Sequence, residues 1–281
     1  MSNQANFIYQ NIISTLLLTG ELVNTRNSNS YSCINYPRIA FTNTPLVTIR
    51  KTAWKKALRE MEWFMSGDIK CPDELMDWWD GQLGYGNMYR GGYSDQFRKS
   101  GHTYHLQFDQ IKYILDGLKN NPNSRRLIAT TWNPWDMANI TEMNHNPQTP
   151  TTCHGTLLNF FVRENKVYMT VYQRSADILL GVPHNWMQYW ALLLYFSTHA
   201  NLEVGALMWL FGDLHLYDET SHIATAKQII QCQPFKNTYH EIQYIFSGEN
   251  LLSCPKFKAS DFSMDGMIPQ PMVLTRPKLL A

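Results

Sequence analysis

The residues best suited to chemistry lie in one stretch of the chain, Thr151 to Asn185. It contains Cys153 and His154 and, further along, Arg174. An ionised thiol is a strong nucleophile, and a nearby guanidinium lowers a thiol pKa toward neutrality. The pattern therefore indicates nucleophilic attack by Cys153 as a thiolate, helped by the charge of Arg174. The plainer alternative is a cysteine that acts as a small buried hydrophobe beside a structural histidine.

Two strands must position these groups. Residues 156–162 and 167–173 are rich in β-branched and aromatic residues, and the polar segment 163–166 separates them, which is typical of a hairpin. Antiparallel pairing would bring the thiol, the imidazole and the run Gln173-Arg174-Ser175-Ala176-Asp177 to one end of a sheet. After the turn at 181–183, the apolar segment from Asn185 to about Ala200 predicts a buried helix.

The rest of the chain predicts an α+β protein with one domain over residues 1–281, in which helices pack on a mixed or antiparallel sheet. Gly-bearing and Asn-Pro-Thr-rich polar segments, 91–103 and 139–151, are interpreted as surface loops. Apolar periodicity predicts helices over 4–19, 51–66, 106–120 and 218–231, and strands over 127–131 and 206–212.

Composition excludes several classes of protein. Lys plus Arg total 24 against 23 for Asp plus Glu, so the chain lacks the general basic field that DNA binding needs. Five cysteines without a CxxC pair fit a reducing compartment, and we expect a cytoplasmic protein. No apolar run approaches the roughly 20 residues that span a bilayer, so no membrane partner is expected. His102 and His105 have no companion ligands nearby in the sequence, and no metal is expected.

Five sequence blocks stand out along the chain. They are PNSRRLIATTWNP at 122–134, Cys153-His154, YQRSAD at 172–177, LGVPHN at 180–185 and FGDLHLY at 211–217. Together they resemble the signature blocks of the thymidylate synthase family, in the expected order and at close to the expected spacing. The resemblance extends from about Gly20 to the neighbourhood of Pro271.

This resemblance implies a reaction. Cys153 would add to C6 of dUMP, and C5 would then attack the methylene carbon of the cosubstrate 5,10-methylenetetrahydrofolate. Glu60 and Tyr85 would assist removal of the C5 proton, with His154 beside the nucleophile. From the residues alone, the alternative for Glu60 is a salt bridge to Arg59 or a neighbouring lysine, because an unpaired carboxylate on an apolar helix face is costly.

The resemblance also implies a nucleotide site that two chains share in a homodimer, with a sheet face as the dimer interface. Asn185 would read the uracil, since an amide can donate to O4 and accept from N3–H, which favours dUMP over dCMP. His215 and Tyr217 would bind the deoxyribose 3′-hydroxyl; without the resemblance they would be a hydrogen-bonded pair at a sheet edge, and Arg26 a solvated charge. The remaining implied substrate ligands are Arg26, Arg174, Ser175 and Gln173, with Arg125 and Arg126 reaching the partner's phosphate.

On the folate side, the resemblance implies contacts from Asp177, Leu180, Gly181 and His184, and from Trp78 or Trp79. Departures from the family pattern gather here. His184 stands where phenylalanine is usual, Ala53 replaces a usual histidine, the loop at 78–82 is short, and the tail at 275–281 lacks the usual closing sequence.

These departures leave the last step open. Hydride transfer from tetrahydrofolate would give dTMP and dihydrofolate, which is the thymidylate synthase reaction and the one that the family resemblance favours. Addition of water would make the protein a dUMP hydroxymethylase, an activity of the same family in viruses, in which case it would act in the host cytoplasm. A third alternative is a non-catalytic relative that binds a nucleotide or RNA. The thiol of Cys153 argues against this alternative, because binding alone does not need a thiol.

Overall fold

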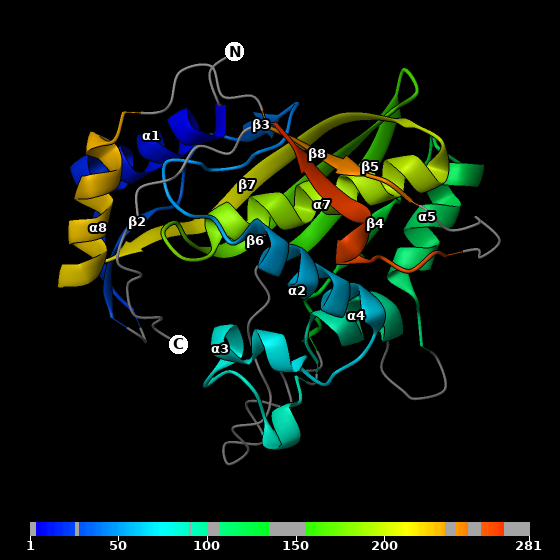
Figure 1. Ribbon diagram of the computed structural model, residues 1–281, viewed down its shortest axis with the longest axis horizontal. Helices are drawn as coiled ribbons and strands as arrows, with labels where there is room; N and C mark the ends of the chain where they lie inside the picture. Colours follow the sequence, from blue (N-terminus) through cyan, green and yellow to red (C-terminus); the bar gives the residue numbers. More distant parts are fainter. Residues whose placement is uncertain are drawn as a thin grey trace.

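The computed structural model describes residues 4–25, 28–89, 91–100, 107–134, 155–233, 240–246 and 254–266. Within them, seven α-helices pack on a mixed seven-stranded sheet, which confirms the predicted α+β class. Figure 1 shows α1 and α8 at one end of the molecule and α5 at the other. The helices are α1 (Gln4–Thr19), α2 (Trp54–Ser66), α3 (Met76–Trp79), α4 (Tyr93–Lys99), α5 (Gln110–Asn120), α7 (Val182–Ala200) and α8 (Thr220–Gln231).

The large sheet has the order β1-β2-β7-β6-β5-β4, and β3 also pairs with β7. A second, two-stranded sheet pairs β8 with β9. The strands are β1 (Glu21–Asn24), β2 (Asn29–Cys33), β3 (Ile39–Phe41), β4 (Ile128–Thr130), β5 (Gly155–Arg163), β6 (Lys166–Asp177), β7 (Glu203–Tyr217), β8 (Glu241–Tyr244) and β9 (Phe262–Asp265).

The predicted hairpin is confirmed as β5 and β6. Arg163 pairs with Lys166 across a two-residue turn in which Glu164 and Asn165 have φ of 49° and 62°. Positive φ at both turn positions suits the right-handed twist of the strands. Strand β6 continues past the predicted end to Asp177, so the polar run after Gln173 belongs to the sheet.

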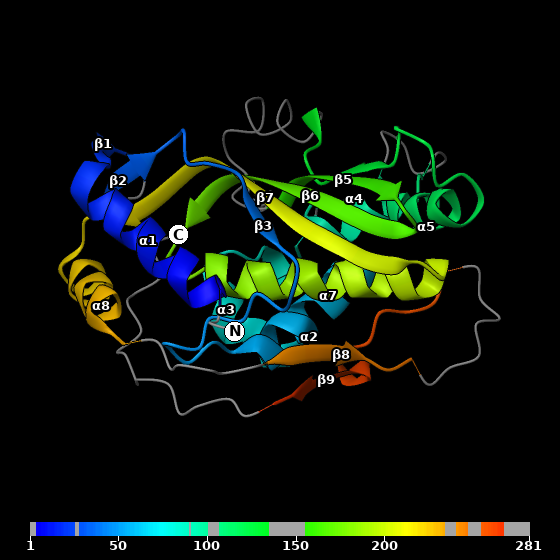
Figure 2. The same cartoon turned by 90° about the horizontal axis from the view of Figure 1, so that it is seen from above.

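Helix α7 connects β6 to β7, the one parallel pair among the described strands of the large sheet, as parallel pairing requires a crossover. It starts at Val182, with Pro183 in its first turn, and ends at Asn201 in the left-handed conformation. Figure 2 shows α7 between the large sheet and the two-stranded β8–β9 sheet. A helix that is apolar on nearly all sides is a core helix, so its polar residues Asn185 and Gln188 are carried into the core.

The two faces of the sheet differ in burial. Along β6, Val167, Met169 and Val171 are fully buried, whereas Tyr168 is half-buried and Tyr172 is 39% exposed. This alternation is the period of a strand with one face in the core. The second face is therefore only partly covered in the single chain.

The loop predicted over 91–103 is wrong, because residues 93–99 form α4. Tyr93 and Phe97, one helical turn apart, are buried, and Tyr93 stacks on Phe64 with ring centroids 4.1 Å apart. Spacing of i and i+4 places two aromatic rings on one face, and this packing outweighs the preceding glycines. The loop predicted over 139–151 lies outside the described residues, as do His102 and His105.

Other boundaries shift for local reasons. Helix α5 begins at Gln110 instead of 106, because the Asp109 side chain accepts a hydrogen bond from the backbone N–H of Lys112 (2.9 Å) and caps the helix there. Helix α2 begins at Trp54 and stops at Gly67, whose φ is 78°. In the part of the chain that the structure describes, no helix is both long and apolar enough to cross a membrane.

Candidate active site

Glu60 lies on α2 and is 7% exposed. Its Oε1 accepts a hydrogen bond from Trp79 Nε1 and its Oε2 from Gln188 Nε2, both at 2.6 Å. The salt bridge to Arg59 considered above is wrong: Arg59 binds Glu62 and Glu74. Burial raises the pKa of Glu60 to about 7, although the two donated hydrogen bonds act in the opposite direction. A carboxyl group with this pKa can hold or release a proton near neutral pH.

Asn185, in the first turns of α7, is joined to Glu60 by hydrogen bonds. Asn185 Nδ2 donates to Gln188 Oε1 (3.0 Å), and Gln173 Nε2 donates to Asn185 Oδ1 (3.1 Å). Trp209 Nε1 in turn donates to Gln173 Oε1 (3.2 Å). We call this set the amide chain; it runs Trp209, Gln173, Asn185, Gln188, Glu60, Trp79, and every member is at most 7% exposed.

Arg174 and Ser175 follow Gln173 on β6 and are half-buried. The Arg174 guanidinium lies over the ring of Trp132, with Cζ 5.3 Å from the ring centroid. Parallel pairing of β6 with β7 sets Ser175 beside Asp213 and Asp177 beside His215. The Arg174 guanidinium and the Ser175 hydroxyl therefore lie on β6 beside the end of β7 that carries His215.

His215 and Tyr217 do share one region of β7, with ring centroids 5.0 Å apart, and both are largely buried. His215 Nδ1 lies 3.4 Å from the Asp213 carboxylate, which also accepts a short hydrogen bond from Ser32. Burial disfavours the charged imidazole, but the Asp213 hydrogen bond and the Asp177 carboxylate outweigh it and raise the pKa of His215. The His215 hydrogen bond correspondingly lowers the pKa of Asp213.

On the other side of Glu60, the two tryptophans have different surroundings. Trp79 is buried among aromatic rings and donates to Glu60. Trp78 is half-buried against the His184 ring, at 4.9 Å between centroids. His184 Nδ1 lies 2.8 Å from Leu180 O, and its Nε2 accepts from the Ala53 N–H at 3.3 Å. Two departures from the family pattern, His184 and Ala53, thus touch each other.

Asp177 and its neighbours shape the start of α7. The Asp177 Oδ1 accepts hydrogen bonds from the backbone N–H groups of Leu179 (2.9 Å) and Leu180 (3.2 Å). The Gly181 N–H donates to Asp177 O (3.1 Å). The predicted folate ligands at 177, 180 and 181 therefore form one tight turn.

Three predicted site residues lie at the surface, in contrast to the buried amide chain. The Tyr85 side chain is 86% exposed. Arg125 and Arg126 are both exposed and precede β4. Tyr113 Oη donates to the Arg126 carbonyl (2.8 Å), which fixes the backbone there.

Cys153, His154 and Arg26 lie outside the described residues. Gly155, two positions after Cys153 in the sequence, pairs with Gln173 in the β5–β6 ladder. Within the described ranges, no three His, Cys, Asp or Glu side chains gather in a way that could hold a metal ion.

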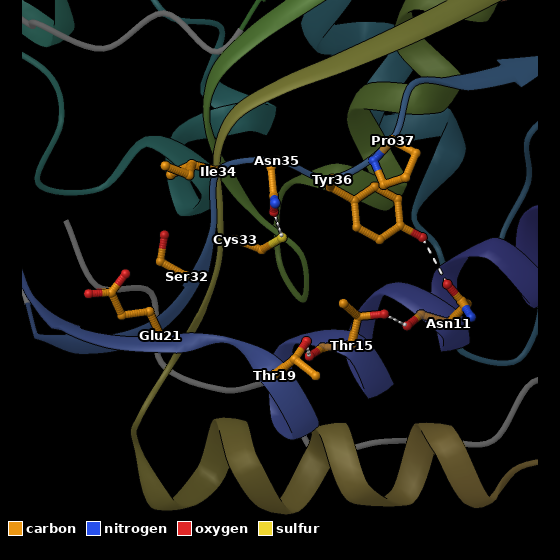
Figure 3. A pocket seen from close by; sticks show the side chains of 10 residues that line it. All are labelled: Asn11, Thr15, Thr19, Glu21, Ser32, Cys33, Ile34, Asn35, Tyr36 and Pro37. Atoms are coloured by element: carbon orange, nitrogen blue, oxygen red, sulfur yellow. Dashed lines mark hydrogen bonds between the residues drawn. The ribbon is translucent and has the colours of Figure 1, made fainter.

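A cavity of about 580 Å³ lies elsewhere, between α1 and the segment after β2. Figure 3 shows its mixed polar and apolar lining, including a hydrogen bond from Tyr36 Oη to Asn11 Oδ1 (3.0 Å). None of the predicted site residues lines it. It is thus a feature separate from the amide chain.

Gln188 and Asp213 are site residues that the sequence analysis missed. Gln188 had a readable signal: it is a polar residue in an apolar helix, three positions after Asn185 and hence on the same face. Asp213 stands two positions before His215 on a strand, where side chains point to the same face.

Comparison with known proteins identifies the family of the chain. The family model described as Thymidylate synthase matches residues 7–276. A protein named Thymidylate synthase from Corynebacterium aurimucosum is 34% identical over 240 residues, which cover 82% of this chain and 80% of the relative. With nearly its whole length matched, the chain belongs to the thymidylate synthase family.

Proposed function

We propose that this protein transfers and reduces the one-carbon unit of 5,10-methylenetetrahydrofolate onto C5 of dUMP, giving dTMP and dihydrofolate. The observation that carries the proposal is the amide chain, which links the uracil-reading Asn185 to the buried acid Glu60. Nucleotide recognition and proton transfer then belong to one hydrogen-bonded unit. Cytoplasmic location is part of the proposal and is supported by the free thiols of Cys33, Cys71, Cys232 and Cys254.

Binding of dUMP relies on three kinds of contact. Arg174, with Ser175 and Arg26, holds the phosphate, because a guanidinium forms paired hydrogen bonds with an oxyanion. His215 and Tyr217 hold the 3′-hydroxyl. Asn185 donates to O4 and accepts from N3–H of the uracil.

Catalysis begins when the Cys153 thiolate bonds to C6 of the pyrimidine, which makes C5 an enolate carbon. C5 then bonds to the methylene carbon as the bond from that carbon to N10 of the folate breaks, and the C5 proton leaves. Glu60, working through water, takes part in this proton transfer, for which a pKa near 7 is well matched. The assignment of Tyr85 and His154 to the same step rests on the sequence resemblance. The remaining bond to N5 breaks to give an exocyclic methylene, hydride from the resulting tetrahydrofolate reduces it, and the Cys153–C6 bond breaks to release dTMP and dihydrofolate.

The folate side is built from the half-buried Trp78 and His184 rings and the turn at Asp177. Aromatic rings beside a carboxylate suit a flat pterin that carries N–H donors. Trp78 is the tryptophan assigned to the folate, because the Trp79 N–H is used by Glu60.

The product tests this proposal. Purified protein is incubated with dUMP and 5,10-methylenetetrahydrofolate, and the nucleotide product is analysed by mass spectrometry while dihydrofolate formation is followed by absorbance. We expect dTMP and dihydrofolate in equal amounts. A nucleotide heavier than dTMP by one oxygen, without dihydrofolate, would contradict the reduction step.

The same proposal includes a homodimer. The partly exposed sheet face offers apolar rings, with Phe161 and Tyr168 stacked at 5.3 Å, and the exposed Arg125 and Arg126 are available to a second chain. An Arg126→Ala chain mixed with a Cys153→Ser chain should regain activity on subunit exchange, because one site of each mixed dimer is intact. Verified exchange without recovery would count against shared sites.

A second candidate, dUMP hydroxymethylase, is favoured by one observation. His184 brings polar ring edges to the contact with Trp78 and Ala53, where the family usually has phenylalanine. Water that reached the methylene intermediate would give 5-hydroxymethyl-dUMP and tetrahydrofolate. Exclusion of water from this side decides between the two reactions, and the mass measurement above separates them.

A further inference from the structure

The amide chain has a direction, which its two ends determine. An indole N–H can only donate a hydrogen bond. The Trp209 N–H therefore requires the oxygen of the Gln173 amide to face it, and the nitrogen of Gln173 then faces Asn185. Asn185 must in turn accept from Gln173 with its oxygen and point its nitrogen toward Gln188.

The other end imposes the same direction. Trp79 Nε1 donates to one oxygen of Glu60, and Gln188 Nε2 donates to the other and also to Ala57 O (3.1 Å). With its nitrogen committed to two acceptors, Gln188 offers only its oxygen to Asn185. Amide orientations are assigned from such networks, and here both ends require the same assignment.

We propose that Gln188 is a positioning residue that fixes the Asn185 amide in its uracil-reading orientation and keeps Glu60 supplied with a hydrogen-bond donor. This inference rests on the proposed function, since it concerns recognition of dUMP. Gln188 is fully buried and is the one side chain in the amide chain that touches both Asn185 and Glu60.

The orientation matters because uracil and cytosine present opposite patterns. Uracil offers an acceptor at O4 and a donor at N3–H, whereas cytosine offers a donor at N4 and an acceptor at N3. An Asn185 amide turned by 180° would exchange its donor and acceptor and match cytosine. Asparagine alone therefore does not decide between dUMP and dCMP; the neighbour that blocks the turn contributes to the selectivity.

Two substitutions at one position separate the two halves of this role. Gln188→Glu keeps an oxygen facing Asn185 but replaces the donor to Glu60 by a second carboxylate. Gln188→Met has a similar volume and removes both interactions. Two readouts are used: the ratio of dCMP to dUMP dissociation constants by calorimetry, and titration of the Glu60 carboxyl by carbon-13 NMR, assigned with a Glu60→Gln spectrum.

We expect Gln188→Met to reduce the ratio of the dCMP and dUMP dissociation constants about tenfold, the upper end of what one neutral hydrogen bond contributes. The same substitution should move the titration of the Glu60 carboxyl to higher pH, because it removes a hydrogen-bond donor to the carboxylate. Gln188→Glu should keep the ratio within about twofold of the starting protein, a change smaller than one hydrogen bond, while altering the Glu60 titration strongly, because two adjacent carboxylates share one proton. If Gln188 only fills space, Met should change neither readout. Equal loss of selectivity in both variants would also overturn the inference.

Two variants at the ends of the chain keep the test decisive if Gln188→Met does not fold. Trp209→Phe removes the donor that orients Gln173 and should reduce the dCMP/dUMP ratio without moving the Glu60 titration. Trp79→Phe should move the titration of the Glu60 carboxyl without changing the dCMP/dUMP ratio. Identical responses of these two variants would refute a directed chain.

A starting protein that binds neither nucleotide would refute the proposed function itself, whereas dUMP preference that survives Gln188→Met refutes only the role of Gln188.

Discussion

The amide chain and the contact of His184 with Trp78 and Ala53 are held in different ways. In the amide chain, each buried side chain can take one orientation, because the donors at both ends are fixed. The His184 contact consists of a half-buried ring pair and two hydrogen bonds to backbone atoms, to Leu180 O at 2.8 Å and from the Ala53 N–H at 3.3 Å. In the proposed function, the buried amide chain therefore determines which base is bound, whereas the half-buried His184 contact bears on the last step and lies outside that chain.

The largest effect is expected from a substitution that removes the nucleophile and leaves the amide chain in place. Cys153→Ser should reduce turnover by about 10⁴-fold or more, because a nucleophile that acts with its neighbours accounts for much of the rate. The dissociation constant of dUMP should stay within about threefold, since a hydroxyl replaces a thiol without loss of a strong contact. Turnover is measured by dihydrofolate absorbance and binding by calorimetry. Near-normal activity would refute nucleophilic catalysis by Cys153.

A second change tests whether the amide chain reads the base. Asn185→Asp replaces a donor and acceptor by acceptors only, so the side chain can no longer donate to uracil O4 but can accept from cytosine N4–H. The preference for dUMP over dCMP should fall by about 10²-fold or reverse, as expected where a buried polar group loses its match. Competition between the two nucleotides for the site measures it. An unchanged preference would assign base reading to another residue.

Much of the structure around the amide chain could be predicted from the sequence, because the β5–β6 hairpin and helix α7 are specified by local sequence patterns. Alternating β-branched residues around a polar turn specify the β5–β6 hairpin, and an unbroken apolar run specifies α7. The end of the hairpin then fixes the neighbourhood of Gln173, Arg174 and Asp177. The family resemblance added roles to these positions.

The rest depends on partners that are distant in sequence. Glu60 had an expected partner one residue away in Arg59, yet its partners are Trp79 and Gln188. Helix α4 depends on stacking of Tyr93 against Phe64 on another helix. The divergent settings of Trp78 and Trp79 follow from a short helix, α3, that sends consecutive side chains in different directions. Such contacts are properties of the folded chain rather than of any one segment.

A third change tests the electrostatic state of the amide chain through stability. Burial raises the Glu60 pKa from the ordinary 4.5 to about 7. Between these values the folded protein holds a proton that the unfolded chain releases, so folding stability falls as pH rises through this window. The loss amounts to about 3 kcal/mol above pH 7.

Glu60→Gln should therefore gain about 3 kcal/mol relative to the starting protein between pH 4.5 and pH 8. The amide nitrogen of the new glutamine also faces one of the two N–H donors, from Trp79 or Gln188, that Glu60 accepts. The free energy that this mismatch costs is the same at both pH values. Urea unfolding at the two pH values gives the difference. A constant difference between the proteins would mean that Glu60 keeps its ordinary pKa despite its burial.

The smallest effect is expected where the contacts are weakest. His184→Phe removes the hydrogen bonds to Leu180 and Ala53 but keeps a flat ring against Trp78. If the imidazole admits water, the methyl product should rise severalfold over any hydroxymethyl product, since exclusion of water decides the branch. dUMP affinity should not change, because the amide chain does not include His184. A shift in dUMP affinity with an unchanged product ratio would show that the His184 contact is coupled to the amide chain, and the proposed independence of the two regions would then be wrong.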